Sequence, residues 1–137
     1  QAVDWIPESL FQIVTAAFRH RGLSFVRILQ RCPEFVGNMF EPWVHDPQRM
    51  LMLTHENGIK VSPALQKIYR NQVEHDPSNI DRAREIASSE DPIPVGILYR
   101  NPEVPCYEDL RRAGMLRTAG SIRSTLESEF DKFTVWP

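Results

Sequence analysis

The first apolar pattern in the chain has the spacing of an α-helix. One stripe is formed by Leu10, Ile13, Val14, Ala17 and Phe18. Pro7 suits the first helical position, because the N–H that proline lacks would have no partner there. Arg19 and His20 place cations near the negative end of the helix dipole. Gly22 offers a left-handed stop, so the pattern predicts a helix from about Pro7 to His20.

The next apolar run is short and nearly continuous, as in a strand that is covered on both faces. It contains Leu23, Phe25, Val26, Ile28 and Leu29. Pro33 cannot donate a ladder hydrogen bond, so strand pairing is expected to stop at Cys32. Cys32 is therefore expected at the carboxyl end of a buried parallel strand, where open α/β folds bind their ligands.

The residues alone leave two interpretations of Cys32 open. Free cysteine is among the most buried residue types, so Cys32 is either a small apolar residue that caps the core or a ligand or redox residue. The other cysteine, Cys106, lies in a proline-rich loop and is interpreted as structural or incidental. Two cysteines do not make a disulfide framework, which favours a reducing cytosol.

Residues 33–60 are predicted to be irregular, because prolines and glycines interrupt them. This loop is unusually apolar, with Phe35, Met39, Phe40, Trp43, Val44, Met50, Leu51, Met52 and Leu53. Either it folds over the core of its own domain or it contacts a partner chain, since large exposed apolar patches mark interfaces.

Two more helices and a second strand are predicted in the middle of the chain. Ser62 is expected to cap a helix that has Pro63 at its first position and continues to about His75. Residues 76–78 break that helix and cap an amphipathic helix that ends near Ser88. Residues 93–99 form the second apolar strand.

The last third of the chain is mostly polar from residue 101 to 120 and then becomes amphipathic. A terminal amphipathic segment is predicted from about Ser121 to Phe133, with Trp136 as a bulky anchor behind it. Its apolar side consists of Ile122, Leu126, Phe130 and Phe133.

Composition narrows the possible partners. The chain has 137 residues, enough for one domain with a modest core, and a net charge of −2. This charge gives no electrostatic basis for binding nucleic acid or an anionic membrane, and no apolar stretch approaches the length of a membrane span. We therefore expect no nucleic acid, no membrane and a cytoplasmic location.

The chain is also expected to be a piece of a larger protein. It begins at Gln1, and only two strands are convincing. Both have the composition of buried parallel strands, which need further strands and covering helices to hide both faces.

No complete active site can be assembled from the residues. The chain contains no nucleophile elbow, Walker sequence or zinc-protease helix motif. The four histidines lack metal-ligand spacing and are interpreted as surface or helix-end residues; they are His20, His45, His55 and His75. The acidic pairs at 90–91 and 108–109 are interpreted as solvated turn or helix-start residues.

Several segments, taken together, resemble the C-terminal half of the β subunit of the thiamine-diphosphate-dependent 2-oxoacid:ferredoxin oxidoreductases, of the 2-oxoglutarate or pyruvate type. The segments occur in the family's order and cover about residues 7–112. They are Ala16–Gly22, the strand Ser24–Pro33 with its Gln-Arg-Cys-Pro end, the His-Asp-Pro turn at 75–79, the closing strand Ile-Pro-Val-Gly-Ile-Leu-Tyr at 93–99, and Tyr107-Glu108.

The resemblance implies an α/β fold, the C-terminal part of a thiamine-diphosphate-binding-type parallel sheet with flanking helices. That part would be residues 1–112, and residues 113–137 would be an extended C-terminal arm with a short amphipathic helix. By position, Cys32 is similar to the family's fourth ligand of a [4Fe–4S] cluster. The other three cysteines and the diphosphate-binding motif belong to an N-terminal half that this chain lacks, so no catalytic residue is assigned here.

The resemblance also implies cofactors and partners. The cofactors are thiamine diphosphate, Mg²⁺ and the [4Fe–4S] cluster. The partners are an α subunit, a second β subunit, ferredoxin, a 2-oxoacid and coenzyme A. The reaction is oxidative decarboxylation to an acyl-CoA, or its CO₂-fixing reverse. The chain alone is not expected to be active.

The sequence departs from the family's pattern beside the cysteine. Arg31 stands where the commonest signature has proline, and residues 34–36 replace its threonine, aromatic residue and asparagine. The positive charge of Arg31 would raise the reduction potential of a cluster bound by Cys32.

The alternative function is a non-catalytic interaction module that docks through its apolar loop and C-terminal arm.

Overall fold

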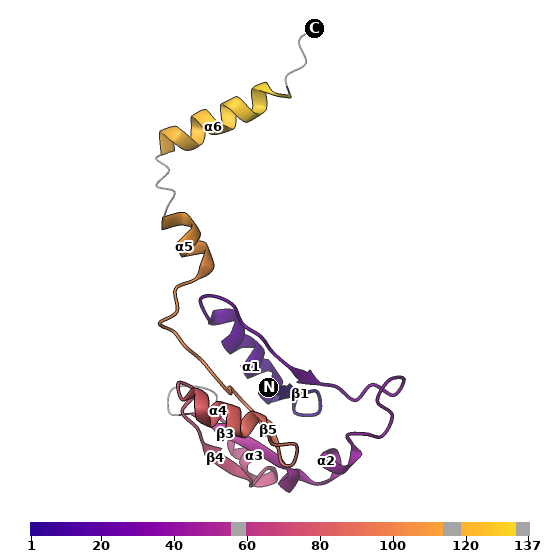
Figure 1. The fold of residues 1–137 in the computed structure, drawn as a ribbon. Helices are drawn as coiled ribbons and strands as arrows, with labels where there is room; N and C mark the ends of the chain where they lie inside the picture. Colours follow the sequence, from indigo (N-terminus) through magenta and orange to yellow (C-terminus); the bar gives the residue numbers. More distant parts are fainter. Residues whose placement is uncertain (56–59, 114–118, 134–137) are drawn as a thin grey trace. The chain divides into compact units, whose positions relative to one another are not determined.

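The computed structural model describes residues 1–55, 60–113 and 119–133 of the chain. Contacts divide the chain into two compact units, Gln1–Val104 and Pro105–Pro137, and each is described here by itself (Figure 1). The strands are β1 (Ala2–Val3), β2 (Ile28–Leu29), β3 (Met50–Thr54), β4 (Gln72–Glu74) and β5 (Ile93–Val95). The helices of the first unit are α1 (Pro7–Arg19), α2 (Glu41–His45), the 3₁₀ turn η1 (Pro47–Arg49), α3 (Pro63–Ile68) and α4 (Ile80–Ala87).

The centre of the first unit is a three-stranded parallel sheet with the order β4-β3-β5 (Figure 1). In its register Met52 is opposite Gln72 on one side and Val95 on the other. Met50 and Met52 are at most 1% exposed and belong to the hydrophobic core cluster, together with Ile13 of α1. The sheet is therefore organised around β3.

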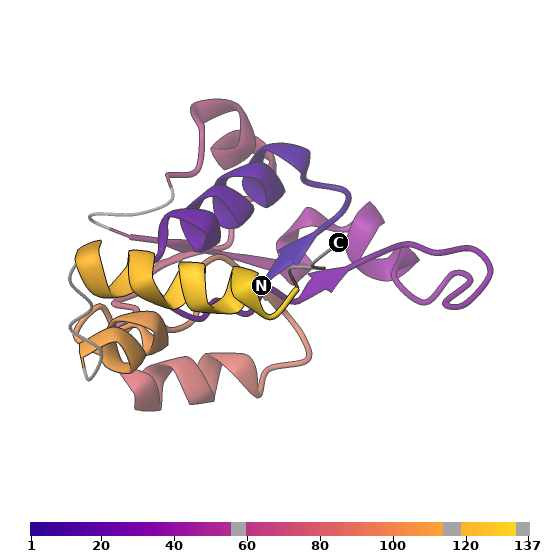
Figure 2. The same cartoon turned by 90° about the horizontal axis from the view of Figure 1, so that it is seen from above.

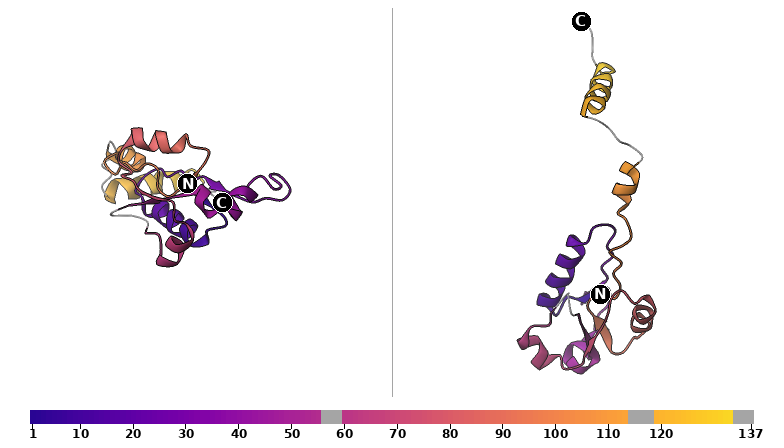
Figure 3. Two further views of the ribbon diagram at one scale, coloured as in Figure 1. Left: turned by 90° about the horizontal axis from the view of Figure 1, so that it is seen from below. Right: turned by 90° about the vertical axis from the view of Figure 1, so that its left-hand side faces the viewer.

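Helices cover this sheet on both faces. Figures 2 and 3 show α1 and α3 on one side of the strands and α4 on the other. Ile13 is the buried apolar residue of α1, and α4 buries Ala83 and Ile86. Because side chains alternate along a strand, Leu53 lies on the face of β3 opposite to Met52. Both faces of β3 are therefore buried.

A second, smaller sheet consists of β1 and β2, which run parallel with Ala2 opposite Ile28. Gln1 connects it to the three-stranded sheet. The N–H groups of Gln1 and Gly96 donate to each other's carbonyl oxygens at 2.8 and 3.0 Å, and Gln1 Nε2 donates to Pro94 O at 2.8 Å. The end of β5 is thereby fixed to the start of β1.

Most of the helix starts predicted from the sequence are confirmed. α1 begins at Pro7, and the hydroxyl of Ser62 accepts a hydrogen bond from Leu65 N at the start of α3. The next helix, α4, is capped by Asn79, which accepts from Arg82 N, rather than by residues 76–78. Gly22 has the expected positive φ, 125°, but it lies beyond the C-cap His20.

The prediction of a buried strand over residues 23–29 is wrong. Only Ile28 and Leu29 pair, and pairing ends before Gln30 rather than at Cys32. Leu23 and Phe25 are 93% and 89% exposed. The physical reason is that β2 has one neighbouring strand, the two-residue β1, among the residues that the structure describes.

The strands β3 and β4 lie where the sequence predicts an irregular segment and a helix. The apolar residues 50–53 belong to β3, so the prediction of an irregular segment over residues 33–60 is wrong there. The helix predicted to reach His75 ends at Ile68, and Val73 lies in β4. Both strands are stabilised by pairing with residues distant in sequence, which a local pattern does not reveal.

The apolar loop folds largely over its own domain. Phe40 and Trp43 pack against the core, and the residues of β3 are inside it, whereas Phe35 and Met39 are 91% and 60% exposed. The α/β class, with parallel strands and flanking helices, is confirmed. The thiamine-diphosphate-binding type of the sheet and the division at residue 112 stay predictions.

The second unit contains α5 (Tyr107–Ala113) and α6 (Ala119–Asp131). The predicted terminal amphipathic helix is confirmed by α6, and the predicted apolar stripe is exposed, from 44% at Ile122 to 81% at Phe133, which lies just beyond the helix. The helix α5 was not predicted, although residues 108–109 are its acidic first turn. Trp136 lies outside the described residues. None of the described helices is long and apolar enough to cross a membrane.

Candidate functional site

The parallel pair β1 and β2 brings two chain segments together at its carboxyl edge. Asp4 follows β1 directly, and Arg31 and Cys32 follow β2. The two strands are held together by Ala2 N to Arg27 O at 2.9 Å and Asp4 N to Leu29 O at 3.1 Å. Because both strands point in the same direction, their carboxyl ends meet, which is where parallel α/β sheets bind ligands.

Cys32 sits in a tight turn at this edge. Its N–H donates to Gln30 O at 3.1 Å, and its carbonyl accepts from Val36 N at 2.9 Å. The thiol is free and the residue is partly exposed. In Figures 2 and 3 the segment after β2 extends away from the rest of the first unit. Cys32 is thus accessible and is not a core residue that caps the sheet.

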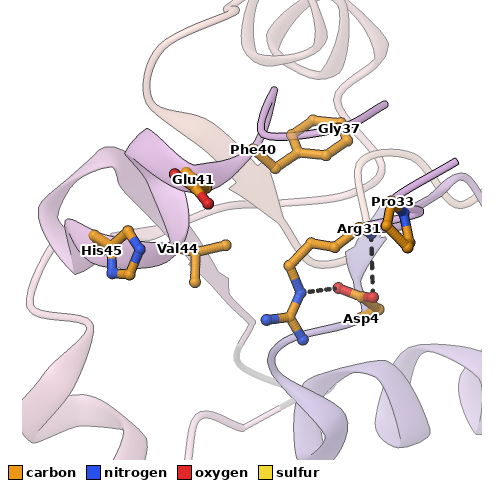
Figure 4. Close-up of a pocket in the computed structure, with 8 residues that line it drawn as sticks. All are labelled: Asp4, Arg31, Pro33, Gly37, Phe40, Glu41, Val44 and His45. Carbon is orange, nitrogen blue, oxygen red and sulfur yellow. Dashed lines mark hydrogen bonds and ion pairs between the residues drawn. The ribbon is translucent and has the colours of Figure 1, made fainter. Parts of the chain in front are cut away.

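Asp4 holds the residue that precedes Cys32. One carboxylate oxygen, Oδ2, accepts from the backbone N of Arg31 at 3.2 Å, and Oδ1 accepts from Arg31 Nε at 3.0 Å (Figure 4). The guanidinium carbon of Arg31 lies 5.8 Å from the ring centroid of Trp5. The ion pair and the aromatic ring together fix the side chain of Arg31.

These residues form one wall of an open hollow of about 420 Å³. Figure 4 shows Arg31, Asp4 and Pro33 on one side, with Glu41, Val44 and His45 of α2 facing them. The hollow is lined by Asp4, Arg31, Pro33, Gly37, Phe40, Glu41, Val44 and His45. Its mixed charges and apolar residues suit binding and positioning, and they do not form a nucleophile–base pair.

The described residues do not form a metal site by themselves. No three histidine, cysteine or acidic side chains gather closely enough in residues 1–55, 60–113 and 119–133 to hold an ion. Cys32 fits the role of a single thiolate donor, because it is free, partly exposed and held in a hydrogen-bonded turn. Trp5, which contacts Arg31, has a buried Nε1–H without an acceptor in the described part of the chain.

Sequence reasoning missed Asp4 and Trp5. They follow Ala2 and Val3, an apolar pair too short to be recognised as a strand. Their position beside Arg31 depends on the pairing of β1 with β2, which joins residues that are 26 positions apart. A sequence signal that links such distant segments does not exist in a single chain.

The interpretation of His55 and His75 as surface or helix-end residues is wrong. They are 7% and 3% exposed, and each directly follows a strand of the three-stranded sheet. His55 Nδ1 contacts His75 O at 2.8 Å, so it carries the proton, and His55 Nε2 accepts from Ile97 N at 3.3 Å. His75 Nε2 contacts Leu98 O at 2.7 Å. The pair connects the carboxyl ends of all three strands.

Burial is the main influence on the pKa of His55. It lowers the pKa of His55, and the neighbouring His75 acts in the same direction, while the hydrogen bond to the His75 carbonyl opposes both. The neutral ring of His55 uses both nitrogens, one as donor and one as acceptor. These contacts make His55 a structural connector rather than a candidate metal ligand.

The acidic pairs differ in their roles. Asp91 accepts from Arg49 Nη2 at 2.6 Å and from Trp43 Nε1 at 3.3 Å, so it anchors the segment before β3 and is not simply solvated. The bonded guanidinium of Arg49 lowers the pKa of Asp91. Cys106 is also free, and its carbonyl oxygen accepts hydrogen bonds from Asp109 N and Leu110 N at the start of α5; its interpretation as structural or incidental stays a prediction.

Comparison with known proteins gives two matches. Residues 65–113 match the family described as the C-terminal part of the pyruvate ferredoxin oxidoreductase β subunit. A curated relative is the β subunit of 2-oxoacid:ferredoxin oxidoreductase 2 from Aeropyrum pernix, which is 29% identical over 102 residues. The alignment covers 74% of this chain and 30% of that relative, so the chain spans about a third of its length. No solved structure matches the chain.

The two matches agree with the resemblance: the alignment spans 74% of the chain, and the family match includes the His-Asp-Pro turn and the closing strand. The predicted resemblance is therefore confirmed, and the chain is similar to the C-terminal part of the β subunits of 2-oxoacid:ferredoxin oxidoreductases.

Proposed function

We propose that this chain is part of the β subunit of a 2-oxoacid:ferredoxin oxidoreductase and that Cys32 supplies one thiolate to a [4Fe–4S] cluster. The observation that carries the proposal is the position of Cys32. It is a free, partly exposed thiol just beyond the carboxyl end of a parallel strand, in a chain similar to such β subunits.

The remaining ligands would come from the N-terminal half of the subunit, as would the site for thiamine diphosphate and Mg²⁺. Iron–sulfur clusters of this type are held by four cysteine thiolates, and the described residues provide one suitable thiol at this edge. When bound, thiamine diphosphate activates the 2-oxoacid for decarboxylation, and the cluster accepts electrons singly.

The roles of the chain's own residues follow from their positions. The turn around Cys32 would present the thiolate, and its backbone hydrogen bonds would keep it in place. Asp4 would hold Arg31, the residue before it. The His55–His75 pair would fix the carboxyl ends of the neighbouring strands. Coenzyme A, ferredoxin, an α subunit and a second β subunit are the partners that this proposal includes.

Exposed apolar side chains support the proposal that this chain packs against other protein segments. Phe18, Leu23, Phe25 and Phe35 are each about nine-tenths exposed, at 89%, 93%, 89% and 91%. All four lie in or beside the segment that leads to Cys32. A surface of this kind marks an interface, here with the rest of the enzyme.

The experiment that tests the proposal compares the two cysteines in the assembled enzyme. Cys32→Ser should lower the iron and sulfide content and remove the low-temperature paramagnetic signal of the reduced cluster, because serine does not supply the thiolate. Thiamine diphosphate should remain bound. Cys106→Ser is the matched control and should change neither quantity.

A reversed pattern, with the cluster lost in Cys106→Ser and retained in Cys32→Ser, would contradict the assignment. Retention of the full cluster in both variants would contradict the role of this chain as a ligand donor.

A further inference from the structure

The structure changes what is expected of the positive charge beside Cys32. We propose that Asp4 compensates the charge of Arg31 and thereby sets the reduction potential of the cluster that Cys32 binds. The proposal rests on the function proposed above and assigns Asp4 a positioning role.

The contacts of Asp4 are specific for this role. Its two carboxylate oxygens bind different parts of Arg31, one the backbone N at 3.2 Å and the other Nε at 3.0 Å. The backbone contact fixes the peptide that leads directly into Cys32, and the side-chain contact fixes where the positive charge lies. The Asp4 side chain is 27% exposed and that of Arg31 48%, so solvent screens the pair only in part.

The electrostatic consequence follows from the charge change at the cluster. Reduction adds one electron, so a nearby positive charge stabilises the reduced form and a nearby negative charge destabilises it. Asp4 and Arg31 together carry no net charge. Removing either partner leaves the other unbalanced, and the two removals act with opposite signs.

Other charges around the hollow do not determine this sign. Glu41 and His45 face Arg31 across the hollow and are present in every variant that the test compares. Their contribution therefore cancels in the differences. A role limited to holding the turn in shape would affect both partners in the same direction, by loosening the same contact.

The test is potentiometry of the assembled enzyme, followed by the paramagnetic signal of the reduced cluster and by iron content. Asp4→Asn should raise the midpoint potential and Arg31→Gln should lower it. Each should change the ratio of reduced to oxidised cluster at fixed potential by up to about tenfold, which is 59 mV for one electron. The double variant should return close to the unmodified enzyme, and Arg31→Lys should stay close to it.

Arg84→Gln is the matched control, because Arg84 forms a comparable ion pair with Asp81 at 3.1 Å on α4, an element that contributes nothing to the hollow. It should not shift the potential. Shifts of the same sign in Asp4→Asn and Arg31→Gln, or no shift in either, would overturn the proposal. If Asp4→Asn loses the cluster, the difference between Arg31→Gln and Arg31→Lys decides, and equal potentials in those two overturn it.

The result also separates this inference from the proposed function. If Cys32→Ser keeps the cluster, the ligand assignment fails. If Cys32→Ser loses the cluster but the charge variants leave the potential unchanged, the ligand assignment stands and the role of Asp4 fails.

Discussion

The three-stranded sheet and the β1–β2 edge use similar apolar residues, but they bury them to very different extents. Leu53 in β3 is 1% exposed, whereas Leu23, before β2, is 93% exposed. In β3 each face is covered by helices and each edge by a strand. β2 has one short neighbour, and its approach segment carries Phe25 at 89% exposure.

This difference indicates a division of tasks within one unit. The three-stranded sheet is held by contacts inside the chain, including the His55–His75 pair at its carboxyl edge. The β1–β2 edge carries the candidate ligand Cys32 on a segment whose apolar side chains are exposed in this chain. Under the proposed function they would pack against another part of the enzyme. A site shared between segments needs such an edge, because ligands from elsewhere must be able to reach it.

The largest expected effect comes from making the same substitution in the two regions. Leu53→Ala should lower the free energy of unfolding by about 2–5 kcal/mol, because it leaves a cavity in a packed sheet. Leu23→Ala should change it by less than about 0.5 kcal/mol in the chain alone. Denaturant unfolding of both variants measures the contrast. Equal losses would show that residues 23–29 are buried after all.

A glycine pair sharpens the comparison at the level of the backbone. Gly96 has φ of 146°, and an added Cβ would lie 2.6 Å from the Cβ of Leu53. Gly96→Ala should therefore lower the free energy of unfolding by about 3 kcal/mol, because backbone strain and overpacking act together. Gly37, in the turn after Cys32, has φ of 47° and open space around it.

Gly37→Ala should lower the free energy of unfolding by about 1–2 kcal/mol, because the only penalty is placing a Cβ on a left-handed backbone. The two variants are measured in the same unfolding series. A larger loss for Gly37→Ala than for Gly96→Ala would mean that the turn, not the sheet, is the more tightly packed region.

The prediction for pH concerns the histidine connector of the three-stranded sheet. The pKa of His55 is lowered from 6.5 in the folded chain, so the unfolded chain binds a proton more readily. His55 thus contributes stability that is complete above about pH 6.5 and is lost as the pH falls through the folded pKa. His55→Asn should flatten the fall in melting temperature below pH 6.5, and an unchanged slope would exclude His55 as its source.

The helix α6 should have the smallest effect on the folding of the first unit. Its apolar residues are more exposed than core residues, with Leu126 at 52% and Phe130 at 71% exposure. Deleting residues 121–137 should leave the unfolding of the first unit unchanged but weaken subunit assembly in the whole enzyme. Sedimentation velocity measures the assembly, and an unchanged mass and dissociation would contradict docking through this helix.

What the sequence could predict depends on how local each feature is. The start of α1 at Pro7 and the Ser62 cap are set by neighbouring residues, and both were predictable. The strand β3 was not, because Met50–Leu53 lacks β-branched residues and follows a loop rich in proline and aromatic side chains. β4 was hidden because Val73 continues the helical spacing of the preceding apolar residues.

The candidate site shows the same limit. Cys32 could be singled out because Pro33 beside it cannot continue strand pairing, although β2 ends earlier, at Leu29, and the resemblance gave Cys32 a role. Asp4 could not, since it reaches Arg31 only through the pairing of β1 with β2. The burial of His55 and His75 likewise depends on three strands that meet at one edge.

The central claim is that the β1–β2 edge with Cys32 is completed by other parts of the enzyme, while the three-stranded sheet is held together by contacts within this chain. Hydrogen exchange, measured on the isolated chain and on the assembled enzyme, tests it most directly. The amides of residues 50–54 and of Ile93 and Val95 should be protected in both, and those of residues 23–36 should be clearly better protected in the assembled enzyme. Equal protection of residues 23–36 in both states would contradict the account.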